Sequence, residues 1–530
     1  MVGTTGSGVN RTEWRWVALV ALAVLTASSL PYLVAWAVAP EGARFTGLLV
    51  NPLDGHSYIA KMRQGLNGSW RFRLVFTPEF QEGAYVYLLF IALGHVGRWT
   101  GLPLVVVYHC ARLLASAALF VVAYRFIAML AGEREQRRLC LLLLGISSGL
   151  GWLVAPITTY LSSDLWVPEA FVFYSILGTL HFPLGITLML VILMALARPG
   201  RELGWRGTLV AAVASVGLGV VQPFGVIPVY ATLAVWLALR WWRDRRVDWR
   251  TAGWTAVAGL VAVVYPLYGV LAIRSDPVLT SWSAQNQTPS PPVWDWLLGF
   301  GLVAVLAVPG GVVTIRRRSA GGLLLLAWVI AAGVGMYAPL ALQRRLALGL
   351  EVPVALLAGT GWWDVIRPRL PVRRRGFLAA AMLSLSALTN LLIMAMLALA
   401  ALGGEPLFYL SGGEWQALEW LREEADPDEV VLCAPQTGMF VPAWAGQRVV
   451  YGHPFETVDA ERREAQVKAY WAGEMSLAER ESFLRENGVD YVLVGARELE
   501  IGDWGLRIGE LVGRPVFEAE QVKVYRFNGW

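Results

Sequence analysis

Residues 51–73 of this 530-residue chain read NPLDGHSYIAKMRQGLNGSWRFR. They follow an apolar run at 16–38, WVALVALAVLTASSLPYLVAWAV, which is long enough to cross a bilayer as a single helix. This run is too long for the core of a cleaved signal peptide, so we expect it to be retained. We therefore expect a carboxylate, a histidine and a group of cations close to a membrane. Their role has to be inferred from the rest of the sequence.

The composition is typical of a polytopic membrane protein. Hydrophobic residues make up 56% of the chain, charged residues only 16%, and the mean hydropathy is +0.52, whereas soluble proteins carry about 25% charged residues. The net charge of +5 and the pI near 9.1 do not indicate nucleic-acid binding. The arginines gather in short loops between apolar runs, and this is the pattern of cytoplasmic loops in membrane proteins.

The apolar runs predict about eleven spanning helices. Arg11 and Arg15 precede the first run, so we expect the N-terminus on the cytoplasmic side of a bacterial-type plasma membrane. All arginine clusters between helices except one then fall on the cytoplasmic side. The predicted spans lie at about 16–39, 103–131, 139–156, 180–198, 207–222, 224–241, 252–273, 294–315, 321–341, 346–366 and 377–402.

The sequence predicts two domains. A membrane unit covers 1–402 and includes a long first outer loop at about 40–101. The part of this loop at 85–101 is typical of an amphipathic or half-inserted helix at the outer surface. From Gly403 onward, short Val-rich runs alternate with helical patterns, as in an α/β domain with an open sheet. The odd number of spans places this 403–530 domain outside the cell, so the predicted fold is a polytopic α-helical membrane protein with an extracytoplasmic α/β domain.

Asp54 is the main candidate for chemistry in the first outer loop. Pro52 and Asp54 mark the start of a helix, and Tyr58, Met62 and Leu66 would give it an apolar stripe. Two interpretations stay open from the residues alone: Asp54 caps this helix, or it acts as an acid–base group. His56 by itself is more typical of a structural or interfacial histidine.

Two groups of cations stand on the predicted outer side, against the usual orientation bias. The first consists of Lys61, Arg63, Arg71 and Arg73, and the second of Arg344 and Arg345 within LQRRL. Such residues either contact solvent and lipid headgroups or hold an anionic ligand such as a phosphate. The sequence does not decide between the two.

Other candidates carry weaker signals. His181, with Glu169 and Asp164, lies near the outer end of a helix, where it is either functional or bonded to a neighbouring helix. His453, Glu456, Arg462 and Arg463 follow a predicted strand, and an ordinary solvated helix start is the more typical interpretation. The chain has no GxSxG, P-loop or HExxH motif, and its three cysteines show no CxxC spacing.

The pattern resembles the GT-C superfamily of integral membrane glycosyltransferases. The resemblance rests on Asp54 just after the first helix, on the small residues from Ala60 to Gly65 and Gly68 behind it, on the span number and on the outer C-terminal domain. Two further stretches are similar, YHCARLLASAALFVVAYRF with Arg112, and LQRRLALGLEVPVALLAG. The resemblance is to members that use polyprenyl-phosphate sugars, of the mannosyltransferase and arabinosyltransferase kind.

The resemblance implies transfer of a hexosyl or pentosyl group from a polyprenyl-phosphate donor to a hydroxyl of a glycan, lipid or protein acceptor, on the outer face of the membrane. Asp54 would be the general base. Whether a divalent cation, Mg²⁺ or Mn²⁺, assists stays open. A transporter or flippase of an anionic lipid or saccharide, and a non-catalytic relative with the same fold, are the alternatives. The expected donor-binding residues are His56, Tyr58, Lys61, Arg63, Glu79, His181, Arg344, Arg345 and His453.

Overall fold

The computed structural model describes residues 9–197 and 203–527, so the basic loop expected at 198–206 lies mostly outside the described residues. The chain divides into two compact units, each built from separate parts of the sequence. The first contains Met1–Pro31, His109–Leu267 and Gln287–Met396. The second contains Tyr32–Tyr108, Tyr268–Asn286 and Leu397–Trp530. The first outer loop and the C-terminal region therefore belong to one unit.

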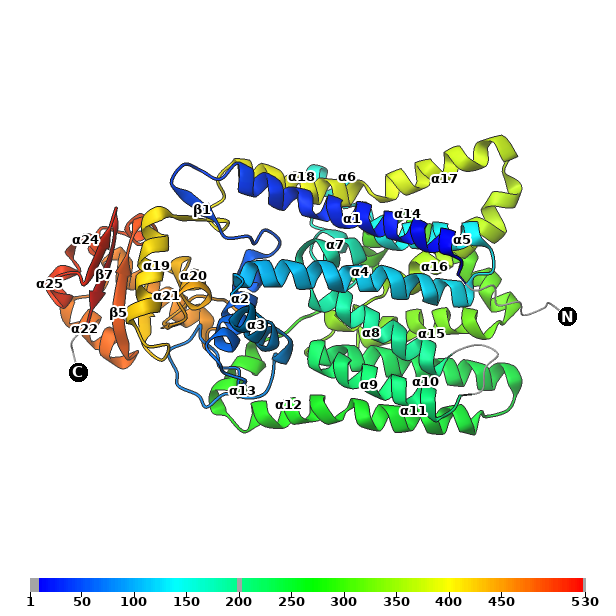
Figure 1. Cartoon of the computed structure of the whole chain (residues 1–530), viewed down its shortest axis with the longest axis horizontal. Helices are drawn as coiled ribbons and strands as arrows, with labels where there is room; N and C mark the ends of the chain where they lie inside the picture. The colour runs from blue at the N-terminus through cyan, green and yellow to red at the C-terminus, as the bar shows by residue number, and fades with distance from the viewer. Residues whose placement is uncertain (1–8, 198–202, 528–530) are drawn as a thin grey trace. The chain divides into compact units, whose positions relative to one another are not determined.

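Apolar helices form the membrane part (Figure 1). Helix α16 is buried along nearly its whole length, whereas α12 has no buried residue, as expected for a helix that faces lipid. Helix α14 packs against α16, and α10 packs against α15. The helices are α1 (Arg11–Ala37), α4 (Leu104–Leu130), α5 (Arg134–Ile146), α6 (Gly151–Thr158), α7 (Val172–Gly178), α8 (His181–Leu196), α9 (Trp205–Val221), α10 (Val226–Asp244), α11 (Trp249–Ala262), α12 (Val264–Arg274), α14 (Val293–Arg317), α15 (Ala320–Gly335), α16 (Glu351–Gly361), α17 (Val372–Ser386) and α18 (Leu388–Leu402).

The polytopic helical fold is confirmed, and helices occupy every predicted span. Within the described residues, six helices are long and apolar enough to cross a membrane, and α17 with α18 form a seventh candidate that is bent by 40°. The runs predicted at 180–198, 207–222 and 321–341 form the shorter helices α8, α9 and α15. The six are Arg11–Ala37, Leu104–Leu130, Arg134–Thr158, Pro223–Asp244, Trp249–Arg274 and Val293–Arg317.

The second unit contains the predicted α/β region. Its five-stranded sheet has the order β4-β3-β5-β7-β6, in which β3 runs parallel to β4 and β5, and β7 runs antiparallel to β5 and β6. A separate antiparallel pair joins β1 (Ala43–Phe45) to β2 (Tyr409–Ser411). The sheet strands are β3 (Val430–Leu432), β4 (Arg448–Val449), β5 (Val489–Val494), β6 (Phe517–Ala519) and β7 (Val522–Arg526), and the neighbouring helices include α19 (Gly412–Glu424), α21 (Ala460–Ala472) and α22 (Leu477–Glu486).

Helix α2 (Pro52–Leu66) is the centre of the first outer loop (Figure 1). It packs against α3 (Leu88–Thr100), the helix predicted to be half-inserted, and against α20 (Thr437–Trp444). Glycine is required between α2 and α3, because a Cβ on Gly65 would lie 2.0 Å from the Ile91 carbonyl oxygen and one on Gly94 would lie 1.9 Å from that of Met62. The contact with α20 brings the residues that follow Asn51 to the C-terminal part of the chain.

Candidate active site

Asp54 does not cap helix α2. The N-cap is Asn51, which has φ 45° and ψ 68°, and Asp54 is the third residue of the helix. The capping interpretation of Asp54 is therefore wrong. The Nδ2 atom of Asn51 donates a hydrogen bond to Oδ2 of Asp54 at 2.5 Å, and 42% of the Asp54 side chain is exposed. The carboxylate thus lies in the first turn of a helix, where the helix dipole favours a negative charge, and its orientation is held by a neighbour.

A buried histidine from the C-terminal region faces this carboxylate. His453 is 1% exposed, and its Nε2 atom lies 3.7 Å from Oδ1 of Asp54. Its Nδ1 atom accepts a hydrogen bond from the backbone N–H of Phe455 at 3.1 Å. A neutral ring that accepts at Nδ1 carries its proton on Nε2. The 3.7 Å between His453 Nε2 and Asp54 Oδ1 is beyond hydrogen-bond distance.

His56 lies inside the protein at the start of α2. Its Nδ1–H donates to the carbonyl oxygen of Pro52 at 2.7 Å, and its ring meets Phe440 edge-on at 4.8 Å. Burial lowers the pKa of His56 to about 4, and the nearby charge of Arg497 acts in the same direction. The ring is therefore neutral at physiological pH. Its Nε2 atom has no hydrogen-bond partner among the described residues.

A buried ion pair fixes α2 to the segment that follows β4. The Nζ atom of Lys61 lies 2.7 Å from Oε1 of Glu456, and the hydroxyl of Ser57 donates to the same oxygen at 2.6 Å. The Tyr87 ring lies 4.6 Å from the ammonium group. Burial raises the pKa of Glu456, but the charge of Lys61, the nearby His453 and the hydrogen bonds from Lys61 and Ser57 together outweigh this effect, so the pKa is lowered. The solvated helix start expected at His453 and Glu456 is wrong, because both side chains are buried.

The remaining candidates of the first loop also have partners within the protein. Glu79 forms an ion pair with Arg463, and Arg73 forms one with Asp428 at 2.8 Å. The aromatic ring of Tyr58 stacks on Phe90, with centroids 4.5 Å apart.

Arg63 is buried, and its Nε–H donates to the Ala443 carbonyl oxygen at 3.3 Å, while burial lowers its pKa to about 10. Lys61 and Arg73 each form an ion pair with a carboxylate, Glu456 and Asp428. These two cations therefore link the first loop to the C-terminal region.

The other candidates belong to the first unit. Arg344 and Arg345 begin the short helix η3 (Arg344–Ala347). Arg344 lies 3.4 Å from Oε1 of Glu169, whereas Arg345 has no ion pair among the described residues and lies over the ring of Phe224 at 4.9 Å. The Nε atoms of both arginines are buried without a hydrogen-bond partner in the described part of the chain. His181 is the first residue of α8 and is also buried.

The sequence interpretation missed Asn51. Asparagine tolerates a left-handed backbone better than other non-glycine residues, and it stands before Pro52 at the helix start, which is the signal that could have identified it.

No described group of three or more His, Cys, Asp or Glu side chains is arranged to hold a metal ion. Asp54 and His453 make a two-residue pair, which falls short of the ligand number of a protein metal cage.

No protein-family model and no curated protein matches the sequence. Among solved structures, the chain is similar to an oligosaccharyltransferase of Archaeoglobus fulgidus tethered with an acceptor peptide, with 14% identity and a TM-score of 0.55, over 91% of this chain and 69% of that one. It is also similar to ArnT of Cupriavidus metallidurans bound to undecaprenyl phosphate, with 13% identity and a TM-score of 0.53, over 96% and 98% of the two chains. The chain has the GT-C fold of these structures.

Proposed function

We propose that this protein transfers a glycosyl group from a polyprenyl-phosphate donor to an acceptor hydroxyl, with Asp54 as the general base. The observation that carries the proposal is the half-exposed Asp54 carboxylate, held by Asn51 and faced by the N–H of a buried His453. The fold supports the same function, because proteins that share it include one bound to undecaprenyl phosphate and one tethered to an acceptor peptide.

The proposed reaction is a single displacement. Asp54 accepts the proton of the acceptor hydroxyl while the acceptor oxygen attacks the anomeric carbon of the donor. The bond between that carbon and the phosphate oxygen breaks, and the lipid phosphate leaves with the electron pair. A single displacement of this kind inverts the anomeric configuration. His453 lies 3.7 Å from Asp54, beyond hydrogen-bond distance, and we propose that its Nε2–H orients the carboxylate once the acceptor is bound.

The leaving phosphate needs positive charge where its own charge develops. Arg344 and Arg345 stay the predicted phosphate-binding arginines of the first unit, where each has an Nε atom that is buried without a partner among the described residues. Lys61 and Arg73 are weaker candidates, because their charges are matched by Glu456 and Asp428.

The test is the lipid-linked sugar content of cells that lack the gene. We expect one polyprenyl-phosphate sugar to accumulate, because a blocked transferase leaves its donor unused. Expression of the wild-type chain should remove this lipid, and expression of Asp54→Asn should not. Normal clearance of the lipid by Asp54→Asn would exclude Asp54 as the base, and unchanged lipid-linked sugars in the deletion strain would argue against the function itself.

A further inference from the structure

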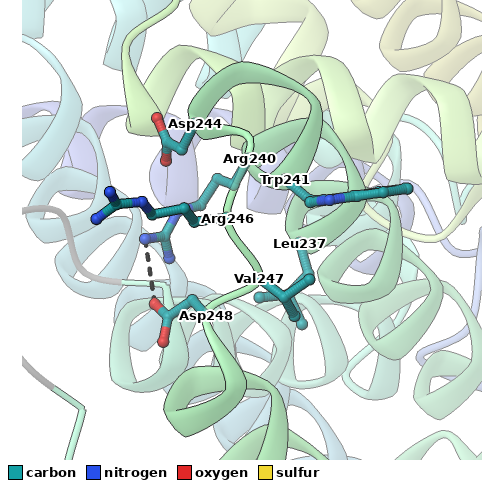
Figure 2. Close-up of a pocket in the computed structure, with 7 residues that line it drawn as sticks. All are labelled: Leu237, Arg240, Trp241, Asp244, Arg246, Val247 and Asp248. Carbon is teal, nitrogen blue, oxygen red and sulfur yellow. Dashed lines mark ion pairs between the residues drawn. The ribbon is translucent and has the colours of Figure 1, made fainter.

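A pocket of about 250 Å³ lies where helix α10 ends and α11 begins (Figure 2). Seven residues between Leu237 and Asp248 line it. It lies in the first unit, and none of the residues that line it takes part in the proposed reaction. Its chemistry is therefore independent of glycosyl transfer.

The charges around this pocket are unbalanced. Asp244 is held by Arg243, with Nε and Oδ1 2.6 Å apart, and Asp248 is held by Arg240 at 3.1 Å. Asp248 also accepts a hydrogen bond from the backbone N–H of Thr251 at 3.0 Å. Asp244 and Asp248 thus each have an arginine partner within the chain.

Arg245 and Arg246 follow directly in the sequence, and both are exposed. Neither has an ion pair with a carboxylate anywhere in residues 9–197 or 203–527. The guanidinium of Arg246 lines the pocket and is left for an external anion.

The pocket has a charged side and an apolar side. Figure 2 shows Arg240, Asp244, Arg246 and Asp248 on one side, and the side chains of Leu237, Trp241 and Val247 on the other. A free inorganic anion would use only the charged side. A ligand with a phosphate next to hydrocarbon would use both, because burial of apolar surface then adds to the ion pair.

The position of the pocket at the ends of these helices indicates that such a ligand would come from the membrane. The pocket joins the ends of two candidate spans, Pro223–Asp244 and Trp249–Arg274. Tryptophan side chains at these ends are strongly exposed, 57% for Trp241, 46% for Trp242 and 76% for Trp249. Exposed tryptophans and arginines at the ends of apolar helices are typical of the level of the lipid headgroups.

We propose that this pocket binds the phosphate headgroup of an anionic phospholipid. Arg246 contacts the phosphate, the neighbouring Arg245 adds charge, and Trp241 with Leu237 and Val247 contacts the glycerol and the first methylenes of the acyl chains. The positive-inside pattern of the arginines assigns the site to the cytoplasmic leaflet.

The experiment measures lipid retention by the full-length protein after delipidation and addition of either phosphatidylglycerol or phosphatidylcholine, using native mass spectrometry. The wild type should bind phosphatidylglycerol in preference. Each surface arginine contributes about 5-fold to binding of an anionic lipid, so Arg245→Ala/Arg246→Ala should weaken it by about 25-fold. Trp241→Ala should weaken it as well. The melting temperature of each variant in detergent checks that it is folded.

The matched control is Arg373→Ala/Arg374→Ala, which removes the same charge from two exposed arginines of α17. This variant should keep the bound lipid. Equal losses in both double variants would mean diffuse attraction and overturn the site. Displacement of the lipid by inorganic phosphate at the same concentration would also overturn the proposal, because the pocket would then be an anion site that does not recognise lipid.

Discussion

Asp54 and His453 meet in the folded chain although they stand near opposite ends of the sequence. Asp54 could be selected as a candidate from the sequence, because an acid just after the first apolar run matches a known pattern. Its partner was not, because His453 sits in a stretch whose polar residues also suit an ordinary solvated helix. In the folded chain His453 is buried, with Phe76 and Phe455 against its ring, and its Nε2 atom lies 3.7 Å from Oδ1 of Asp54.

Asp54→Asn should separate catalysis from structure. Asparagine has the same size, and its side-chain oxygen can still accept the hydrogen bond from Asn51. It cannot accept a proton from the acceptor, so we expect kcat to fall by about 10²–10⁴-fold. The lost interaction with the helix dipole costs only about 0.3–1 kcal/mol of stability. Sugar transfer and melting temperature should be measured on the same purified samples, and an Asn variant with full turnover would remove Asp54 from catalysis.

His56 should make the protein less stable in acid. The pKa of His56 is about 4 when folded, below the ordinary value of 6.5, so the unfolded chain binds more protons between these two values. Its contribution is fully present above about pH 6.5 and is lost as the pH falls towards 4. The total is roughly 3 kcal/mol, since one pKa unit is worth about 1.4 kcal/mol.

Chemical unfolding at about pH 7 and about pH 4.5 would measure this loss for the wild type and for His56→Gln, which cannot titrate there. A smaller pH dependence in the variant is expected. Equal slopes for the two proteins would show that another group causes the acid sensitivity.

The helices of the membrane part were predictable from apolar runs, but their breaks were not. The run predicted at 139–156 divides into α5 and α6, and the last run divides into α17 and α18. The backbone N–H groups of Gly149 and Gly151 at the first break are satisfied by Asp164, which precedes the next helix in the chain. Hydropathy cannot reveal such a partner, because it sums over a window and does not see which polar group supplies the missing hydrogen bonds.

The ion pair between Lys61 and Glu456 should be strongly coupled. Removal of one partner leaves the other charged and buried, which costs about 3–5 kcal/mol, whereas replacement of both by apolar residues is often neutral. We therefore expect Lys61→Met to destabilise the protein strongly and Lys61→Met/Glu456→Leu to recover most of the loss. Lys468→Met is the control, because its pair with Glu464 is exposed and worth about 0.2–1 kcal/mol. Additive effects of the two single changes would contradict the coupling.

The contact between α2 and α3 should depend on Gly65. A Cβ at this position would lie 2.0 Å from a backbone oxygen, so Gly65→Ala must separate the two helices, at a cost of about 1–3 kcal/mol. Gly253→Ala in α11 is the matched control, because no atom lies within 4 Å of a Cβ built there. The control should raise stability by about 0.5–1 kcal/mol, since alanine favours a helix more than glycine does. Similar melting temperatures for the two variants would mean that α2 and α3 are not closely packed in solution.

The division of the chain into units explains why the candidate residues come from both ends of the sequence. Residues of the first loop and of the C-terminal region share one compact unit, and within it Asp54, Lys61 and Glu79 pair with His453, Glu456 and Arg463. The charge pattern of either segment alone resembles that of an ordinary protein surface, because the partner of each charged side chain is supplied by the other segment.

The orientation in the membrane can be tested with single cysteines in a chain whose three native cysteines are replaced by alanine. Arg316→Cys lies at an exposed position in the last turn of α14, and Glu474→Cys lies at an exposed position of the second unit. The positive-inside rule predicts that an impermeant maleimide labels Glu474→Cys in intact cells and Arg316→Cys only after permeabilisation. Asp54 belongs to the same unit as Glu474, so this result would give the proposed base access to a donor in the outer leaflet. The reverse labelling would place Asp54 on the cytoplasmic side and exclude transfer at the outer face.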